Sequence, residues 1–344
     1  AARIDAQRGT NVSVDRVTLG RQRPSAASWD LLPAGPRIPG ELMKCDHVKS
    51  ESATGDRYDA NAVSTGRRSA VVLLCLLAAG VVVAADATAE STANRWYTKQ
   101  TVWHGCDQFH FRINQRDAWV VVPPQSLAGK PWIWRARFPG YHAQMDQQLV
   151  EQGYHLGYVD VAGLFGSPQA VEIGDEFYRF MTEQRGLSST PVLEGVSRGG
   201  LLVYNWAAKH PDKLCCIYCD TPVCDFHSWP RGAGEGIGSE AAWKQCLLAY
   251  GISEAEADSF RGLPIHHAQV IADAKIPLLH IVSENDRVVP PKENTYLLRR
   301  QLQALGHSME VISVPEGTEK SNGHHFDHPH PQQVIDFILK HSRQ

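Results

Sequence analysis

Short apolar runs alternate with helical patterns from residue 96 to the end of the chain. The runs have the length of β-strands, and several are apolar on both faces, as strands buried in a parallel sheet are. They comprise residues 109–113, 118–122, 132–136, 155–159, 192–193, 215–218, 278–282 and 310–314. Between them, apolar residues recur at helical spacing over 173–181, 298–305 and 335–339. Two early strands followed by β–α alternation predict an α/β fold with a doubly wound, mostly parallel sheet of about eight strands.

One segment interrupts this alternation. Residues 223–276 lie between two predicted strands and are too long for a simple connection. They hold a glycine-rich stretch at 228–238 and helical patterns at 241–250 and 254–260. We interpret the segment as a helical cap insertion over an active site. The alternative is a helical decoration that carries a flexible glycine loop.

The N-terminal part of the chain differs from the rest. The first 69 residues show little hydrophobic periodicity, which favours disorder. Arg67 and Arg68 then precede an apolar run at 70–85 that ends in small residues, the pattern of a secretory signal peptide. The run is shorter than the roughly 20 residues that span a bilayer, although an uncleaved membrane anchor is the main alternative. We predict a disordered or spurious extension at 1–65, a signal peptide at 66–87 and a globular domain at 88–344.

The position of this signal has two further implications. A signal peptide normally begins at the N-terminus, whereas this one begins near residue 65 of a chain that starts with Ala1. We expect residues 1–62 to come from a wrongly extended gene start. The signal also predicts a secreted or periplasmic protein that has no stable membrane association after cleavage.

Charge and cysteine content narrow the function classes. The formal net charge of −3 gives no electrostatic case for a nucleic-acid partner. An exported protein could pair some of the cysteines that follow the signal. Cys216 and Cys219 have the spacing of redox and zinc sites, but they lie in an apolar strand-like run and no second such pair follows. We interpret them as buried structural cysteines.

A Gly-x-Ser-x-Gly pattern spans residues 195–199, with Ser197 at its centre. A strand-like segment at 190–194 precedes it and a helical pattern at 201–209 follows it. Strand, tight turn and helix are the setting of a nucleophile elbow, in which the serine hydroxyl projects from a strained turn. Gly195 and Gly199 fit this reading because a Cβ would clash in the tight packing. The alternative is a glycine-rich turn whose serine caps the helix.

A serine nucleophile needs a histidine base and an acid that orients it, in the chain order Ser, acid, His. We predict Asp286 as the acid because it follows the strand-like run at 278–282 directly; Glu284 and Asp220 are competitors. The predicted base is His324, in preference to His325.

Both histidines lie in a segment, 321–330, that is rich in histidine and could also suggest a metal site. Prolines at 329 and 331 favour an extended turn instead, so we predict no metal. The triad chemistry also requires no cofactor.

The sequence also suggests groups that bind the substrate. An oxyanion hole needs two N–H donors, for which we predict the backbone amides of Arg198 and Arg137. The guanidinium groups of Arg135, Arg137 and Arg198 could bind a substrate carboxylate, although salt bridges that brace the loop are an equal alternative. In the predicted cap, Trp229 and Arg231 are placed to contribute to substrate selection.

The elbow around Ser197, the acid loop at Asp286 and the histidine loop at His324 together resemble the α/β-hydrolase superfamily over residues 96–344. The likeness is greatest to its prolyl-oligopeptidase-like and dienelactone-hydrolase-like branches. It implies an α/β-hydrolase fold for 88–344. The Ser-Arg pair is also similar to glucuronoyl esterases, in which the arginine assists the oxyanion. Many relatives carry His-Gly where this chain has Arg-Ala-Arg-Phe.

These inferences predict a secreted serine hydrolase that cleaves a carboxylic ester through an acyl-enzyme. The partner would be a small-molecule or carbohydrate ester; the oligomeric state is not predicted. One alternative is a serine peptidase of the prolyl-oligopeptidase-like type, since the triad does not distinguish esters from amides. A glucuronoyl-type carbohydrate esterase and a catalytically silent binding module are the others.

Overall fold

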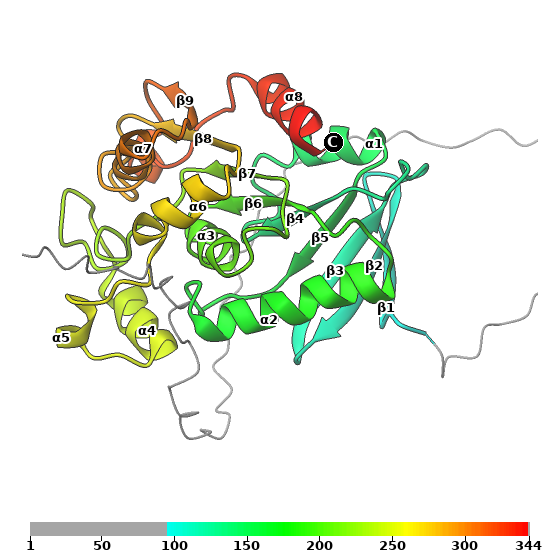
Figure 1. The fold of residues 1–344 in the computed structure, drawn as a ribbon, viewed down its shortest axis with the longest axis horizontal. Helices are drawn as coiled ribbons and strands as arrows, with labels where there is room; N and C mark the ends of the chain where they lie inside the picture. Colours follow the sequence, from blue (N-terminus) through cyan, green and yellow to red (C-terminus); the bar gives the residue numbers. More distant parts are fainter. Residues whose placement is uncertain (1–94, 343–344) are drawn as a thin grey trace, which may run out of the picture. The chain divides into compact units, whose positions relative to one another are not determined.

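A computed structural model describes residues 95–342, and the predicted extension and signal peptide lie outside this range. Within it, nine strands form one sheet in the order β1-β2-β3-β5-β4-β6-β7-β8-β9 (Figure 1). Pairing is antiparallel from β1 to β5 and parallel from β5 through β4 to β9. The strands are Lys99–Trp103, Cys106–Ile113, Arg116–Val122, Trp132–Ala136, His155–Val159, Val192–Val196, Cys216–Asp220, Leu278–Ser283 and Glu310–Val314.

The fold is the mostly parallel α/β-hydrolase sheet that the sequence predicts, with one additional strand. Strand β1 pairs with β2 at the edge, with Lys99 opposite His110 and Trp103 opposite Cys106. Its residues are exposed or half-buried, so the apolar signal that revealed the other strands is absent.

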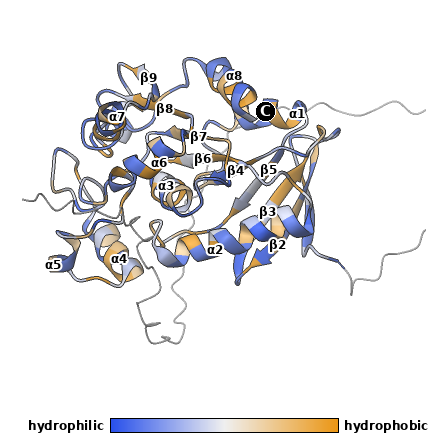
Figure 2. Ribbon diagram, in the orientation of Figure 1, coloured by the Kyte–Doolittle hydropathy of each residue, from blue (hydrophilic) through white to orange (hydrophobic). Residues whose placement is uncertain are grey.

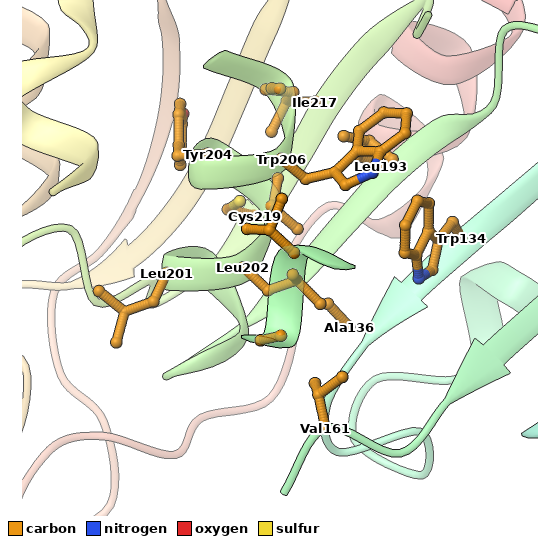
Figure 3. Packing of buried hydrophobic residues seen from close by; sticks show 14 of the residues in the cluster. Trp134, Ala136, Val161, Leu193, Leu201, Leu202, Tyr204, Trp206, Ile217 and Cys219 are labelled. Carbon is orange, nitrogen blue, oxygen red and sulfur yellow. The ribbon is translucent and has the colours of Figure 1, made fainter. Parts of the chain in front are cut away.

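Side chains on opposite faces of the strands contribute to two separate hydrophobic cores. On one face, Trp134 and Leu193 pack against Trp206 of α3 (Figure 3). On the other face, Ile133 and Tyr218 pack beneath α1 and α8. Helices α2, α3, α6 and α7 contribute apolar residues to the first core, and apolar and polar residues alternate along α2 (Figure 2). The α-helices are Gln144–Glu151, Pro168–Arg179, Gly199–Lys209, Glu240–Tyr250, Glu254–Ala257, Ala268–Asp273, Thr295–Ala304 and Pro331–Ser342.

The segment predicted as a cap, 223–276, carries α4, α5 and α6. Helix α6 packs against α3 and α7 and buries Ile271, so it belongs to the helix layer beside the sheet. Helices α4 and α5 lie beyond that layer (Figure 1). Within residues 95–342, no helix combines the length and apolarity needed to cross a membrane.

The Cys-x-x-Cys pair is divided between the two cores. Cys216 lies in the core beneath α1 and α8, whereas Cys219 lies in the core on the opposite face of the sheet. Both are buried and neither forms a disulfide. The two thiols therefore cannot act on one substrate or hold one metal ion.

Candidate active site

Ser197 lies in the turn between β6 and α3, in the left-handed region with a φ of +51°. Residues with a side chain rarely adopt this conformation, and it persists only where neighbours hold it. Here the Ser197 N–H donates to the carbonyl oxygen of Asp220 at 2.9 Å, and the Val223 N–H donates to the carbonyl oxygen of Ser197 at 2.9 Å. Strand β7 and the loop after it thus fix the turn.

The glycines beside the serine are required by close packing. A Cβ on Gly199 would lie 2.1 Å from the carbonyl oxygen of Ala136, at the end of β4. A Cβ on Gly195 would lie 3.0 Å from Sγ of Cys219. Backbone atoms cannot move aside easily, so Gly199 allows the start of α3 to approach β4.

The structure joins Ser197, His324 and Asp286 in one chain of hydrogen bonds. His324 Nε2 lies 3.0 Å from Ser197 Oγ, and His324 Nδ1 lies 2.7 Å from Asp286 Oδ2. The backbone N–H groups of Val288 and Val289 donate to Asp286 Oδ1 at 2.8 and 2.9 Å. The carboxylate therefore holds the Nδ1–H, which leaves Nε2 free to accept the serine proton.

The competing residues considered from the sequence have other partners. Glu284 accepts a hydrogen bond from Tyr296, and Asp220 is paired with His142. His325 lines the pocket, but it lies outside the chain of hydrogen bonds that reaches the serine. The acid and the histidine favoured by the sequence are thus the ones that the structure brings to the serine.

A pocket of about 490 Å³ opens at the serine, within the range that small ligands occupy. Ser197 and His324 both line it, as do Arg198 and Trp229. Arg135, Arg137 and Arg231 are not among its lining residues. Of the five side chains predicted to bind or select substrate, only Arg198 and Trp229 are therefore in place to touch it.

The expectation that Arg135 binds substrate is wrong, because its side chain is fully buried beneath the sheet. It forms ion pairs with Asp146 of α1 and, at 2.8 Å, with Glu194 of β6. It also donates hydrogen bonds to the carbonyl oxygens of Phe138 and Tyr141. Arg135 thus braces the loop between β4 and α1, the alternative that the sequence left open.

The expectation for Arg231 is wrong for a similar reason. Its guanidinium forms ion pairs with Asp258 at 2.5 Å and with Glu254 at 3.0 Å. Both carboxylates belong to α5 or its end, so Arg231 ties parts of the 223–276 segment together.

The Arg137 side chain pairs with Asp160 at 3.2 Å. Its backbone has a φ of +67° and lies beside the elbow, since the Arg137 Cβ would be 3.4 Å from a Cβ on Gly199. The role of its amide in an oxyanion hole stays a prediction, as does that of the Arg198 amide.

Sequence reasoning missed His142, which connects three loops. Its Nδ1 lies 2.5 Å from Asp220 Oδ2, and its Nε2 lies 2.7 Å from the carbonyl oxygen of Phe326. Burial lowers the pKa of His142, but the hydrogen bond and charge of Asp220 outweigh it and leave the pKa raised. The one available signal was that His142 and Asp220 both follow predicted strands, at the sheet edge that carries the serine.

Among residues 95–342, no group of three or more histidine, cysteine, aspartate and glutamate side chains is arranged to hold a metal ion. The histidines near the C-terminus are dispersed: His324 faces the serine, whereas His328 Nε2 lies 3.3 Å from the hydroxyl of Tyr218.

Comparison with known proteins adds a family match. The model of the prolyl oligopeptidase family matches residues 178–343, which include Ser197, Asp286 and His324. No curated protein sequence matches the chain.

Solved structures show the same fold at low identity. An acylaminoacyl peptidase from Pyrococcus horikoshii superposes with a TM-score of 0.52 at 16% identity, covering 72% of this chain and 42% of that one. A puromycin-hydrolyzing peptidase from Mycobacterium tuberculosis gives 0.53 at 15% identity, covering 71% and 40%. The chain therefore spans about two fifths of the length of these enzymes.

Proposed function

Since the chain has the α/β-hydrolase fold and its residues 178–343 match the prolyl oligopeptidase family, we propose that it is a serine peptidase acting on short peptides. The observation that carries the proposal is the chain of hydrogen bonds from Asp286 through His324 to Ser197 at the pocket. Sequence reasoning alone favoured an ester substrate. The family match favours an amide bond instead, and the same triad chemistry applies to both.

The reaction would proceed in two stages. His324 Nε2 takes the proton of Ser197 as the serine oxygen attacks the peptide carbonyl carbon, and Asp286 stabilises the imidazolium that forms. The oxyanion faces the backbone amides of Arg198 and Arg137. His324 then gives its proton to the departing amine, which leaves an acyl-enzyme on Ser197. Water, deprotonated by the same histidine, releases the acid and restores the serine.

A panel of aminoacyl p-nitroanilides and matched p-nitrophenyl esters tests the proposal. We expect turnover of amides, together with labelling of Ser197 by a fluorophosphonate probe that Ser197→Ala abolishes. Turnover of esters without any amide would reinstate the esterase reading. Absence of labelling and of all turnover would favour a silent binding module.

A further inference from the structure

Three aromatic rings surround the guanidinium of Arg198, a residue that lines the pocket. Its Cζ lies 5.4 Å from the ring centre of Phe138, 5.8 Å from that of Phe165 and 5.5 Å from that of Trp229. The rings come from three different loops, after β4, β5 and β7. Cation–π attraction from three sides favours one position of the guanidinium beside the nucleophile.

The described part of the chain offers this cation no carboxylate partner. The charged neighbour that acts on the pKa of Arg198 is another cation, Arg137, and that side chain is already paired with Asp160. The pocket lining contains no aspartate or glutamate. In contrast, Arg135 and Arg231 each bind two carboxylates.

We propose that Arg198 binds a carboxylate of the substrate, so that the peptidase selects peptides with an acidic group beside the scissile bond. The inference rests on the proposed function and specifies its substrate class. A guanidinium presents its N–H donors in a plane and can bind a carboxylate through two parallel hydrogen bonds. Because Arg198 directly follows Ser197, the carboxylate belongs within a residue or two of the attacked carbonyl.

The energetics of the site support this assignment. Burial, with a smaller contribution from Arg137, lowers the pKa of Arg198, the direction expected where water solvates a cation less fully. An entering substrate carboxylate would replace the interaction with water that the Arg198 cation loses on burial, whereas a neutral substrate side chain would leave the cation unpaired. Since the rings already hold the side chain, little conformational freedom is lost on binding.

Two parts of a peptide could supply the carboxylate: an acidic side chain on the acyl side, or the free C-terminus on the leaving side. Glutamyl and glutaminyl p-nitroanilides differ only in the first group. Dipeptide free acids and their amides differ only in the second, with release of the amine as the readout. In one of the two pairs, we expect kcat/KM to favour the acidic member by roughly 10- to 100-fold, the effect of one charge-assisted contact.

Substitutions at Arg198 test the assignment. Arg198→Met should bring the preference to about one, and Arg198→Lys should keep part of it because the charge remains without the planar fork. Lys244→Met is the matched control: it removes an exposed cation that pairs with Glu240 on α4, outside the pocket. It should leave the preference unchanged.

The outcomes separate this inference from the proposed function. An equal loss of kcat/KM for acidic and neutral substrates in Arg198→Met would mean that the side chain assists the oxyanion instead, which overturns the inference. Binding of acetyl-glutamate amide against acetyl-glutamine amide, and of acetyl-alanyl-alanine against its amide, is measured by calorimetry on Ser197→Ala protein. Selective binding of an acidic member there supports the inference even if no peptide is cleaved, and equal affinity in both pairs overturns it.

Discussion

At the scale of single residues, the nucleophile occupies a backbone conformation that its own side chain disfavours. Ser197 keeps a positive φ because hydrogen bonds to Asp220 and from Val223 hold it, and because Gly199 lets the helix start against β4. The hydroxyl is thereby fixed toward His324 Nε2 before any substrate arrives. Such preorganisation is what converts a weak nucleophile into a reactive one.

Ser197→Ala and His324→Ala should each lower kcat by about 10⁴-fold or more, because the members of the triad act as a unit. Neither substitution removes a core contact, so thermal unfolding should stay close to that of the native chain. Steady-state kinetics and calorimetric melting measure the two effects. An active His324→Ala together with an inactive His325→Ala would reassign the base.

Gly199→Ala should disrupt the elbow although it adds only a methyl group. Its Cβ would meet the Ala136 carbonyl oxygen at 2.1 Å, so either β4 or the start of α3 must move. We expect a loss of about 1–3 kcal/mol in the free energy of unfolding, with turnover falling by more than that loss explains. Gly251→Ala is the control: its φ of +66° makes the change strained although a Cβ there has nothing within 4 Å, so it should cost stability without altering turnover. Equal turnover in the two variants would contradict this account.

At the scale of secondary-structure elements, buried ion pairs and hydrogen bonds position the loops around the pocket. Arg135 of β4 holds the loop that contains Phe138 and Tyr141, and it is itself held by Asp146 and Glu194. His142 then links this loop to the end of β7 and to the segment after β9. The shape of the pocket therefore depends on charged side chains that do not line it.

Arg135→Met should destabilise the fold by about 3–5 kcal/mol, because it leaves two buried carboxylates without their cation. Urea unfolding measures the loss. The matched control is Arg112→Met, whose pair with Asp117 is exposed and should cost no more than about 1 kcal/mol. A similar small loss in both variants would show that the buried cluster does not hold the loop.

His142 should make stability depend on pH. Burial lowers the pKa of His142 in the folded chain. The interactions with Asp220 and with the carbonyl group of Phe326 outweigh burial, so the folded pKa is raised. The stabilisation is therefore fully present below the unfolded pKa of about 6.5 and is lost as the pH rises through the folded pKa. The stability difference between the native chain and His142→Gln should be largest below that pH. A difference that stays constant across pH would refute this coupling.

Features with a local sequence pattern could be predicted, whereas contacts between residues distant in sequence could not. The strands at 132–136, 155–159 and 310–314 coincide with β4, β5 and β9, because their patterns are local. The elbow and the two triad loops were placed for the same reason, since each follows a predicted strand. Arg135 was assigned to the substrate because its partners are distant in sequence. The rings around Arg198 were not foreseen, since three separate loops supply them.

At the scale of the whole molecule, the described residues begin after the predicted signal peptide. The apolar run at 70–85 and the small residues after it motivate a processing prediction. In the native host, the mature N-terminus should lie between Thr88 and Thr92, and Leu74→Arg should block cleavage by interrupting the apolar run. N-terminal sequencing tests this, and a mature protein that begins near Ala1 would contradict it.

The placement of the triad on loops after β6, β8 and β9 has a consequence for the nascent chain. His324 is synthesised 127 residues after Ser197. While the chain is still on the ribosome, the elbow therefore exists without its base, and a serine hydroxyl alone is a poor nucleophile. Under the proposed function, translation order keeps the hydrolase inactive until the segment that carries His324 has been synthesised, so that neighbouring unfolded polypeptides are safe from it before then.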